Sequence, residues 1–150
     1  MVHLHATSLR FREEVEESGQ SIPRGRPSLQ PPRWGQFVGK AVQESRGFEA
    51  VGISVRVVGS FYEESDVVVG RVDAASILQG VISVGSSDDV DGVFVSCTSL
   101  RAASVIPEAE RALNKPVTAS NHALAWHLLR LAEIPDTNPN AGRLFQMQLA

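Results

Sequence analysis

The chain has 150 residues, a formal net charge of −3 and a hydrophobic share of 43%. This length suits one α/β domain with a hydrophobic core and is too short for two full ones. The slightly acidic balance, with a pI near 5.8, gives no general attraction for nucleic acid or for acidic membrane surfaces. The apolar runs are only a few residues long, so we expect no membrane-spanning helix and no membrane partner.

The cysteine content and the first residues bear on the compartment. Cys97 is the single cysteine, so no internal disulfide can form, which suits a reducing compartment. The first twenty residues show no apolar core followed by a small-residue cleavage site. We therefore expect no secretory signal and a cytoplasmic protein.

The first third of the chain has a mixed pattern. Residues 8–18 predict a short charged helix. The stretch 21–33 holds four of the eight prolines, which lack the amide donor that helices and inner strands need. We expect 1–33 to be an irregular or atypical N-terminal segment and 34–150 to form the α/β domain. Apolar residues over 34–48 follow helical spacing and predict a helix there.

Beyond residue 50 the pattern alternates between strands and helices. Strands are predicted at 53–61, 93–97 and 115–120, and helices at 73–84, 99–114 and 121–133. Asp73 is a residue of the N-cap type, and Pro107 predicts a kink or a break between two shorter helices. The alternation predicts an α/β fold with a parallel sheet flanked by helices.

Two predicted strands end in polar residues. The first ends in Cys97-Thr98-Ser99 and the second in Ser120-Asn121-His122. Ligands of open parallel sheets bind at the carboxyl ends of strands. Each group precedes a predicted helix, whose N-terminus favours an anion and raises the thiolate fraction of a neighbouring thiol. This pattern predicts a thiol in a carboxylate-sized pocket, able to act as base or nucleophile; the alternative is a buried, inert cysteine.

The remaining chemical groups give weaker signals. His122 and His127 lie on different faces of one predicted helix, and no further histidine or cysteine completes a zinc set. We expect no metal site and attribute His127 to helix packing. The acidic run 63–66 is expected to be a solvated loop that follows a strand and flanks the cleft.

Three stretches resemble a known superfamily. They are GSFYEESDVVVGRVDAASI, VFVSCTSLRAASVIPEAERALNKPV and SNHALAWHLLRLA, followed by a closing GRLF. Together, over about residues 48–146, they resemble the aspartate/glutamate racemase superfamily. The similarity is greatest to the maleate isomerase and arylmalonate decarboxylase branch, and within it to the racemase-like protein of bacterial ectoine-utilisation clusters.

The resemblance implies a fold and a chemistry. It implies two similar α/β domains that each bring a cysteine to a shared cleft, and no metal, pyridoxal or nucleotide cofactor. The two thiols exchange a proton at a carbon next to a carboxylate, or one cysteine adds to a double bond that then rotates. Cys97 matches the second-domain cysteine. Thr98 and Ser99 match the turn whose amides and hydroxyls hold the substrate carboxylate, and Asn121 matches an asparagine after the later strand.

The departures from this pattern lie in the N-terminal third. The first domain and its cysteine have no counterpart, and relatives carry Thr-Pro-Tyr where this chain has Pro31-Pro32-Arg33. We expect this third to be altered or unrelated, as in a truncated reading frame. Since the face normally covered by a first domain would be apolar, we expect homo-oligomers.

Three hypotheses follow. The first is a cofactor-independent isomerase or racemase-family protein that acts on a small carboxylic acid through Cys97, in a maleate isomerase-like or amino-acid racemase-like reaction and in ectoine catabolism. His122 is then a conceivable second base, although it comes from the same layer of strand ends. The second is an inactive truncated homologue or a carboxylate-binding module. The third is an unrelated redox-sensing domain.

Overall fold

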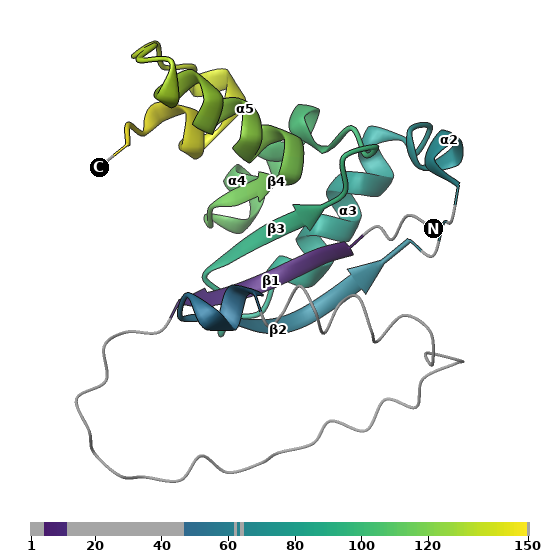
Figure 1. Ribbon diagram of the computed structural model, residues 1–150. Coiled ribbons are helices and arrows are strands. Elements are labelled where there is room, and N and C mark those ends of the chain that lie inside the picture. The colour runs from purple at the N-terminus through teal and green to yellow at the C-terminus, as the bar shows by residue number, and fades with distance from the viewer. Residues whose placement is uncertain (1–4, 12–46, 62, 64, 150) are drawn as a thin grey trace, which may run out of the picture.

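A four-stranded mixed sheet lies at the centre of the computed structural model, which describes residues 5–11, 47–61, 63 and 65–149. Its strands are β1 (His5–Phe11), β2 (Ile53–Ser60), β3 (Gly92–Ser96) and β4 (Val117–Ala119), in the order β2-β1-β3-β4 (Figure 1). β3 and β4 are parallel, whereas β1 is antiparallel to both β2 and β3. The predicted α/β class is therefore confirmed, and within the predicted parallel sheet the parallel pairing is that of β3 with β4, whereas β1 pairs antiparallel on both sides.

The position of β1 was not predicted. The helix expected over 8–18 is wrong for residues 8–11, which belong to this strand. Thr7 pairs with Val58 of β2 on one side and with Phe94 of β3 on the other, so β1 joins the two halves of the sheet. Part of the segment expected to be irregular thus forms an inner strand. The rest of that segment, and most of the helix predicted over 34–48, lie outside the described residues.

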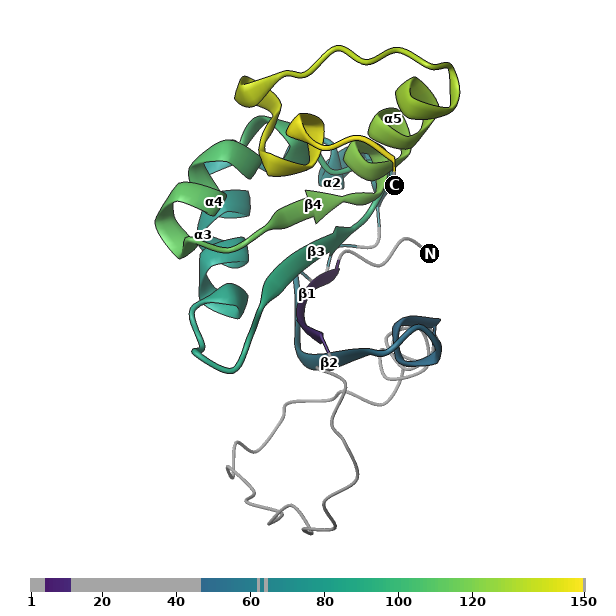
Figure 2. The same cartoon turned by 90° about the vertical axis from the view of Figure 1, so that its left-hand side faces the viewer.

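Two helices cover one face of the sheet, α3 (Ala74–Gly85) and α4 (Ile106–Leu113) (Figure 2). Asp73 caps α3 as predicted, because its Oδ1 accepts from the Ser76 amide at 2.8 Å. Gly85 allows the close approach of three elements. A Cβ at this position would lie 2.6 Å from Leu113 Cδ1 and 2.7 Å from Val93 Cγ2.

The helix predicted over 99–114 consists of two pieces. A single 3-10 turn, η1, spans Ala102–Ser104, and α4 begins only at Ile106. Pro107 lies in the first turn of α4, where the amide that proline lacks has no intrahelical partner in any case. Of the two predicted outcomes, the structure shows a break.

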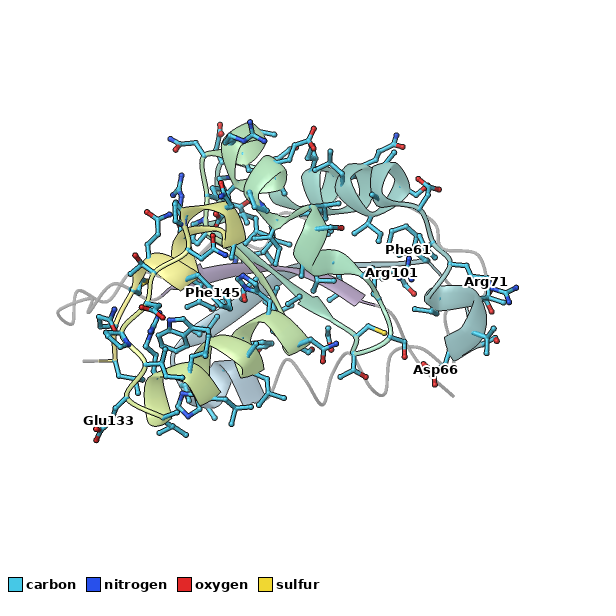
Figure 3. All side chains as sticks on the ribbon, turned by 90° about the horizontal axis from the view of Figure 1, so that it is seen from above. Phe61, Asp66, Arg71, Arg101, Glu133 and Phe145 are labelled. Carbon is cyan, nitrogen blue, oxygen red and sulfur yellow. The ribbon has the colours of Figure 1, made fainter. Side chains whose placement is uncertain are left out.

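The opposite face of the sheet carries α5 (Ser120–Leu131) and a helical turn at 47–50 (Figure 3). The ring of Phe48 in this turn packs edge-on against Phe94, with centroids 5.4 Å apart. A short helix, α2 (Asp66–Val69), follows β2 and anchors itself through the fully buried Val69. None of the helices in the described part of the chain is long and apolar enough to span a bilayer.

The C-terminal tail, residues 134–149, contains the short 3-10 helices η2 (Pro139–Ala141) and η3 (Arg143–Gln146). Three polar side chains are buried in the described part of the chain, and each bonds to the backbone of this tail: Glu110, His122 and Arg130. Glu110 Oε2 accepts from the Arg143 amide at 2.8 Å. Arg130 donates to the carbonyl oxygens of Ile134, Asp136 and Met147. Buried polar contacts therefore attach the tail to the domain.

Candidate functional site

The candidate site lies where β3 and β4 end. Val95 of β3 pairs in parallel with Ala119 of β4, so the residues that follow these two strands emerge at the same edge of the sheet. These residues are Cys97-Thr98-Ser99 and, from the predicted group Ser120-Asn121-His122, Ser120 and Asn121. We call this region the strand-end edge.

A hydrogen bond joins the two strand ends. Asn121 Nδ2 donates to the main-chain oxygen of Thr98 at 2.6 Å. Asn121 is the second residue of α5, whose N-terminus has no side-chain cap. The first amides of a helix have no intrahelical acceptor and carry its positive partial charge. The bond therefore places the turn after Cys97 beside an anion-attracting helix end.

A second hydrogen bond holds the turn from the other side. Ser99 Oγ donates to Oδ1 of Asp66, the first residue of α2, at 2.5 Å. α2 lies close to this turn, since a Cβ at Gly70 would be 3.7 Å from the Ser99 main-chain oxygen. Figure 3 shows Asp66 on α2. Asn121 and Asp66 thus fix neighbouring residues of one turn.

Asp66 lies at the site, but the sequence predicted no contact for it. The acidic run was expected to flank the cleft, but the bond to Ser99 joins residues 33 positions apart. A signal was present in the topology. β2 and β3 are both antiparallel to β1 and so point the same way, which brings the segment after β2 to the strand-end edge.

The thiol of Cys97 lies in a less open position than predicted. The residue is 7% exposed and belongs to the hydrophobic core, where Leu100 is also buried. The helix expected directly after it is absent, because residues 98–101 precede a single 3-10 turn. The positive end of a helix dipole at this edge is therefore that of α5, because the segment that follows Cys97 does not form a helix there.

His122 faces away from this edge into the fold. Its Nε2 lies 2.6 Å from the Ala141 main-chain oxygen and its Nδ1 lies 2.9 Å from Thr118 Oγ1. Because a carbonyl oxygen only accepts, Nε2 carries a proton, and in the neutral ring Nδ1 accepts from the threonine hydroxyl. The ring also packs on Phe145 with centroids 4.7 Å apart. Both ring nitrogens are occupied, so the hypothesis of His122 as a second base is wrong for this arrangement.

The chemical groups at the edge are a thiol, hydroxyls, amides and the carboxylate of Asp66. The residues that the structure describes hold no cluster of three or more histidine, cysteine or carboxylate side chains suited to a metal ion. A groove of about 690 Å³ lies elsewhere, between α4 and the C-terminal tail, with Glu110, Arg111 and Arg143 in its lining. At the strand-end edge, the first amides of α5 are the groups of a kind that can hold a small anion.

Comparison with known proteins gives a consistent result. The family model described as arylmalonate decarboxylase matches residues 42–145, which include the whole strand-end edge. The arylmalonate decarboxylase of Bordetella bronchiseptica is 37% identical over 79 residues, which are 51% of this chain and 33% of that protein.

Two solved structures are also similar, each at 33% sequence identity. One is a glycine-to-cysteine mutant of arylmalonate decarboxylase in the sulfate ion associated form, with a TM-score of 0.54 over 59% of this chain and 39% of that chain. The other is unliganded arylmalonate decarboxylase, with a TM-score of 0.51 over 57% of this chain and 38% of that chain. The chain thus covers well under half the length of each of these relatives.

Proposed function

We propose a function from one premise: the chain belongs to the arylmalonate decarboxylase family, with the Asp/Glu racemase-like fold. The strand-end edge binds a small carboxylic acid, and Cys97 exchanges a proton at the carbon next to the carboxylate. No metal or organic cofactor takes part. The chain spans about a third of the length of the curated relative that it matches, so the activity of the whole relative is a proposal for this chain.

One thiol is sufficient for the proton transfer, because it can both take up and return the proton. In one direction, the thiolate sulfur of Cys97 takes the proton, and the electron pair of the C–H bond passes into the carboxylate to give an enediolate. In a decarboxylation, the C–C bond breaks, carbon dioxide leaves, and the same enediolate takes its proton from the thiol. Water then returns a proton to the thiolate. A single thiol serves one face of the carbon, which favours decarboxylation or isomerisation over two-base racemisation.

The observation that carries the proposal is the hydrogen bond from Asn121 to Thr98. It holds the turn after Cys97 against the uncapped N-terminus of α5. A carboxylate placed there would accept from first-turn amides and meet the positive end of the helix dipole. Thr98 is exposed at this point and supplies a further hydroxyl. Asn121 acts as a positioning residue, because its amide is bonded to the main chain.

Alkylation of Cys97 tests the binding half of the proposal. Iodoacetamide labelling, followed by intact mass, should be slow for a thiol that is 7% exposed and should slow further, in a saturable way, with small carboxylates. Sodium chloride at equal ionic strength is the control for salt effects. The Cys97→Ser variant should take no label, because the chain holds no second thiol.

Deuterium exchange tests the chemical half. Carbon-bound protons next to the carboxylate should exchange with D₂O in the presence of the protein, as followed by proton NMR, and Cys97→Ser should abolish the exchange. Carboxylate protection without exchange would identify a binding module. Labelling that no carboxylate slows would contradict both readings and point to redox chemistry at a lone thiol.

The second candidate function, a carboxylate-binding module or inactive homologue, is favoured by the burial of Cys97. Its side chain packs with the core and does not line any of the three described grooves beside α4 and the tail. The exchange experiment above separates this candidate from the enzyme.

Two finer assignments belong to the same proposal. Within the family, the stretches VFVSCTSLR and SNHALAWHLLRLA support a relation to the racemase-like proteins of ectoine-utilisation clusters. Deletion of the gene should then slow growth on ectoine as carbon source. Association of copies in solution is supported by exposed leucines on α5, at 124, 128 and 131, and sedimentation velocity measures it.

A further inference from the structure

The groove between α4 and the C-terminal tail is lined by positive charge. Figure 2 shows the tail, in yellow, beside α4. The groove has a volume of about 690 Å³, within the range of about 300–1,000 Å³ that is typical of small-molecule sites. Its charged lining residues are Arg111, Arg143 and Glu110, so its net charge is positive in a chain whose formal net charge is −3. Neither arginine forms an ion pair within the described part of the chain, where the pair found joins Arg56 and Asp89.

Most N–H groups of the two arginines are left for a ligand. Arg111 Nε donates to the main-chain oxygen of Pro107 at 3.2 Å. Arg143 Nη2 donates to Asn114 Oδ1 at 2.9 Å. A guanidinium has five N–H donors, so the others in each group make no bond to a described residue. Both side chains are exposed and are held in place by these single bonds.

The carboxylate of Glu110 does not neutralise the arginines, because it faces the main chain. Glu110 is only 4% exposed, and its two oxygens accept from the amides of Val117 at 3.1 Å and Arg143 at 2.8 Å. Gly142, with a φ of +93°, lets the tail approach α4, because a Cβ there would lie 2.9 Å from Ile106 Cγ2. The place of Arg143 relative to α4 is therefore set before any ligand binds.

The two guanidinium groups lie along one side of α4. Asn114, which holds Arg143, comes three residues after Arg111, and residues at this spacing are neighbours on a helix, with Cβ atoms about 5–6 Å apart. The side chain of Arg111 turns back toward Pro107, in the direction of the helix N-terminus. The donors are thus spread along the groove over about two helical turns, or about 10 Å.

This spread of donors fits phosphate better than carboxylate. The fork of one arginine is enough to bind both oxygens of a planar carboxylate. A phosphate group carries three strong acceptor oxygens, and two linked phosphates carry more over several ångströms, so both arginines can be engaged at once.

We propose that this groove is a binding site for a small molecule that carries phosphate groups, with Arg111 and Arg143 holding the phosphate oxygens. The site is separate from the strand-end edge, and it does not depend on the function proposed for that edge.

Inorganic pyrophosphate is the probe, and isothermal titration calorimetry on the full chain at fixed ionic strength measures its dissociation constant. Arg111→Gln and Arg143→Gln should each weaken binding about five- to tenfold, the size of a charge-assisted hydrogen bond at an exposed position. The corresponding lysine variants keep the charge but lose the fork, so they should weaken binding less than the glutamine variants. Citrate, whose negative charge is carried by planar carboxylates, should bind at least about fivefold more weakly than pyrophosphate.

Hydrogen exchange followed by mass spectrometry locates the bound anion. Pyrophosphate should slow exchange over 106–114 and 139–146 and should leave 97–101 unchanged. Slower exchange at 97–101 alone would place the anion at the strand-end edge and overturn the inference.

A matched control separates the groove from the general effect of net charge. Arg71→Gln removes the same charge at an exposed position just after α2, which Figure 3 shows far from Phe145 of the tail, and should leave the dissociation constant unchanged. Equal weakening in Arg71→Gln and in the two groove variants would overturn the site, as would the absence of pyrophosphate binding to the wild-type chain. Citrate that bound as tightly as pyrophosphate would overturn the assignment to phosphate.

Discussion

Asn121 and His122 are neighbours in the sequence, yet they serve two different regions of the molecule. Asn121 is exposed and bonds to the turn of the strand-end edge, whereas His122 is buried and bonds to the C-terminal tail. Asp66 and Phe145 mark the two regions at opposite sides of Figure 3. Buried polar groups must satisfy their hydrogen bonds within the fold. Binding capacity is therefore left to exposed and half-buried groups, such as those of the edge.

The largest effect is expected at Arg130, in the tail region. Arg130→Met keeps the apolar stem but leaves three tail carbonyl oxygens without their donor. The free energy of unfolding should fall by about 3 kcal/mol, as for buried hydrogen bonds to a charged group. Urea denaturation measures this loss, and hydrogen exchange should rise over 134–149. Arg111 is exposed and its Nε donates to the Pro107 main-chain oxygen, so Arg111→Met should change stability by less than about 0.5 kcal/mol.

The next largest effect on the free energy of unfolding is expected for His122→Ala. The variant leaves Thr118 Oγ1 and the Ala141 oxygen without their partner and removes the ring contact with Phe145, at a cost of about 2 kcal/mol. Protection of Cys97 by carboxylates should stay within about twofold of wild type. A much larger loss of protection would mean that tail and edge are not separate regions.

Asn121→Ala should give the reverse result. Its side chain is exposed, so the loss of one hydrogen bond should cost at most about 1 kcal/mol of stability. Carboxylate protection of Cys97 should nevertheless weaken about threefold or more, because the turn is released from the end of α5. Asn140→Ala, a change of the same side chain in the exposed part of the tail, should leave protection unchanged. An Asn121 variant that lost stability without losing protection would contradict its assignment to the edge.

The smallest effect concerns two carboxylates outside both regions. The Ser76 amide, followed by the Ser76 hydroxyl, holds the pKa of Asp73 below its ordinary value of 3.8. The Ser87 hydroxyl, followed by Arg56, lowers the pKa of Asp89 from the same value. A lowered folded-state pKa means that this stability is present above pH 3.8 and is lost as the pH falls through the folded-state values.

Thermal unfolding between pH 6 and pH 2.5 measures this contribution. The midpoint should decline below about pH 4, and Asp73→Asn should make the decline shallower. The protection of Cys97 by small carboxylates should not depend on these two groups. An Asp73 variant that changed this protection would contradict the separation between the helix cap and the strand-end edge.

Local sequence patterns predicted much of the outer fold. Asp73 caps α3, and the continuous apolar run before Cys97 forms β3, because a cap and a buried strand are determined by nearby residues. Pro107 marked a discontinuity at the right place. The prediction of a helix directly after Cys97 was wrong, because contacts to α5 and α2 hold residues 98–101 in a turn. No local sequence pattern encodes these contacts.

Long-range pairing explains the other failures. Residues 8–11 belong to a charged, helix-like pattern but form a strand, because β2 and β3 supply partners on both sides. The sequence identified the four candidate site residues, Cys97, Thr98, Ser99 and Asn121, because they follow predicted strands and match the motifs of a known superfamily. The contact of Asp66 with Ser99, and the inward orientation of His122, depend on how the chain packs after it folds.

The central position of β1 also sets how the molecule reaches its native state. The sheet becomes continuous only when Thr7 of β1 pairs with Phe94 of β3. These two residues are far apart in the sequence. Folding rates fall as such distant contacts become dominant. Until β1 docks, β2 and β3 each present an unpaired edge that another chain can join. Slow refolding and loss of material to aggregates at high protein concentration are therefore the kinetic signature of this strand order.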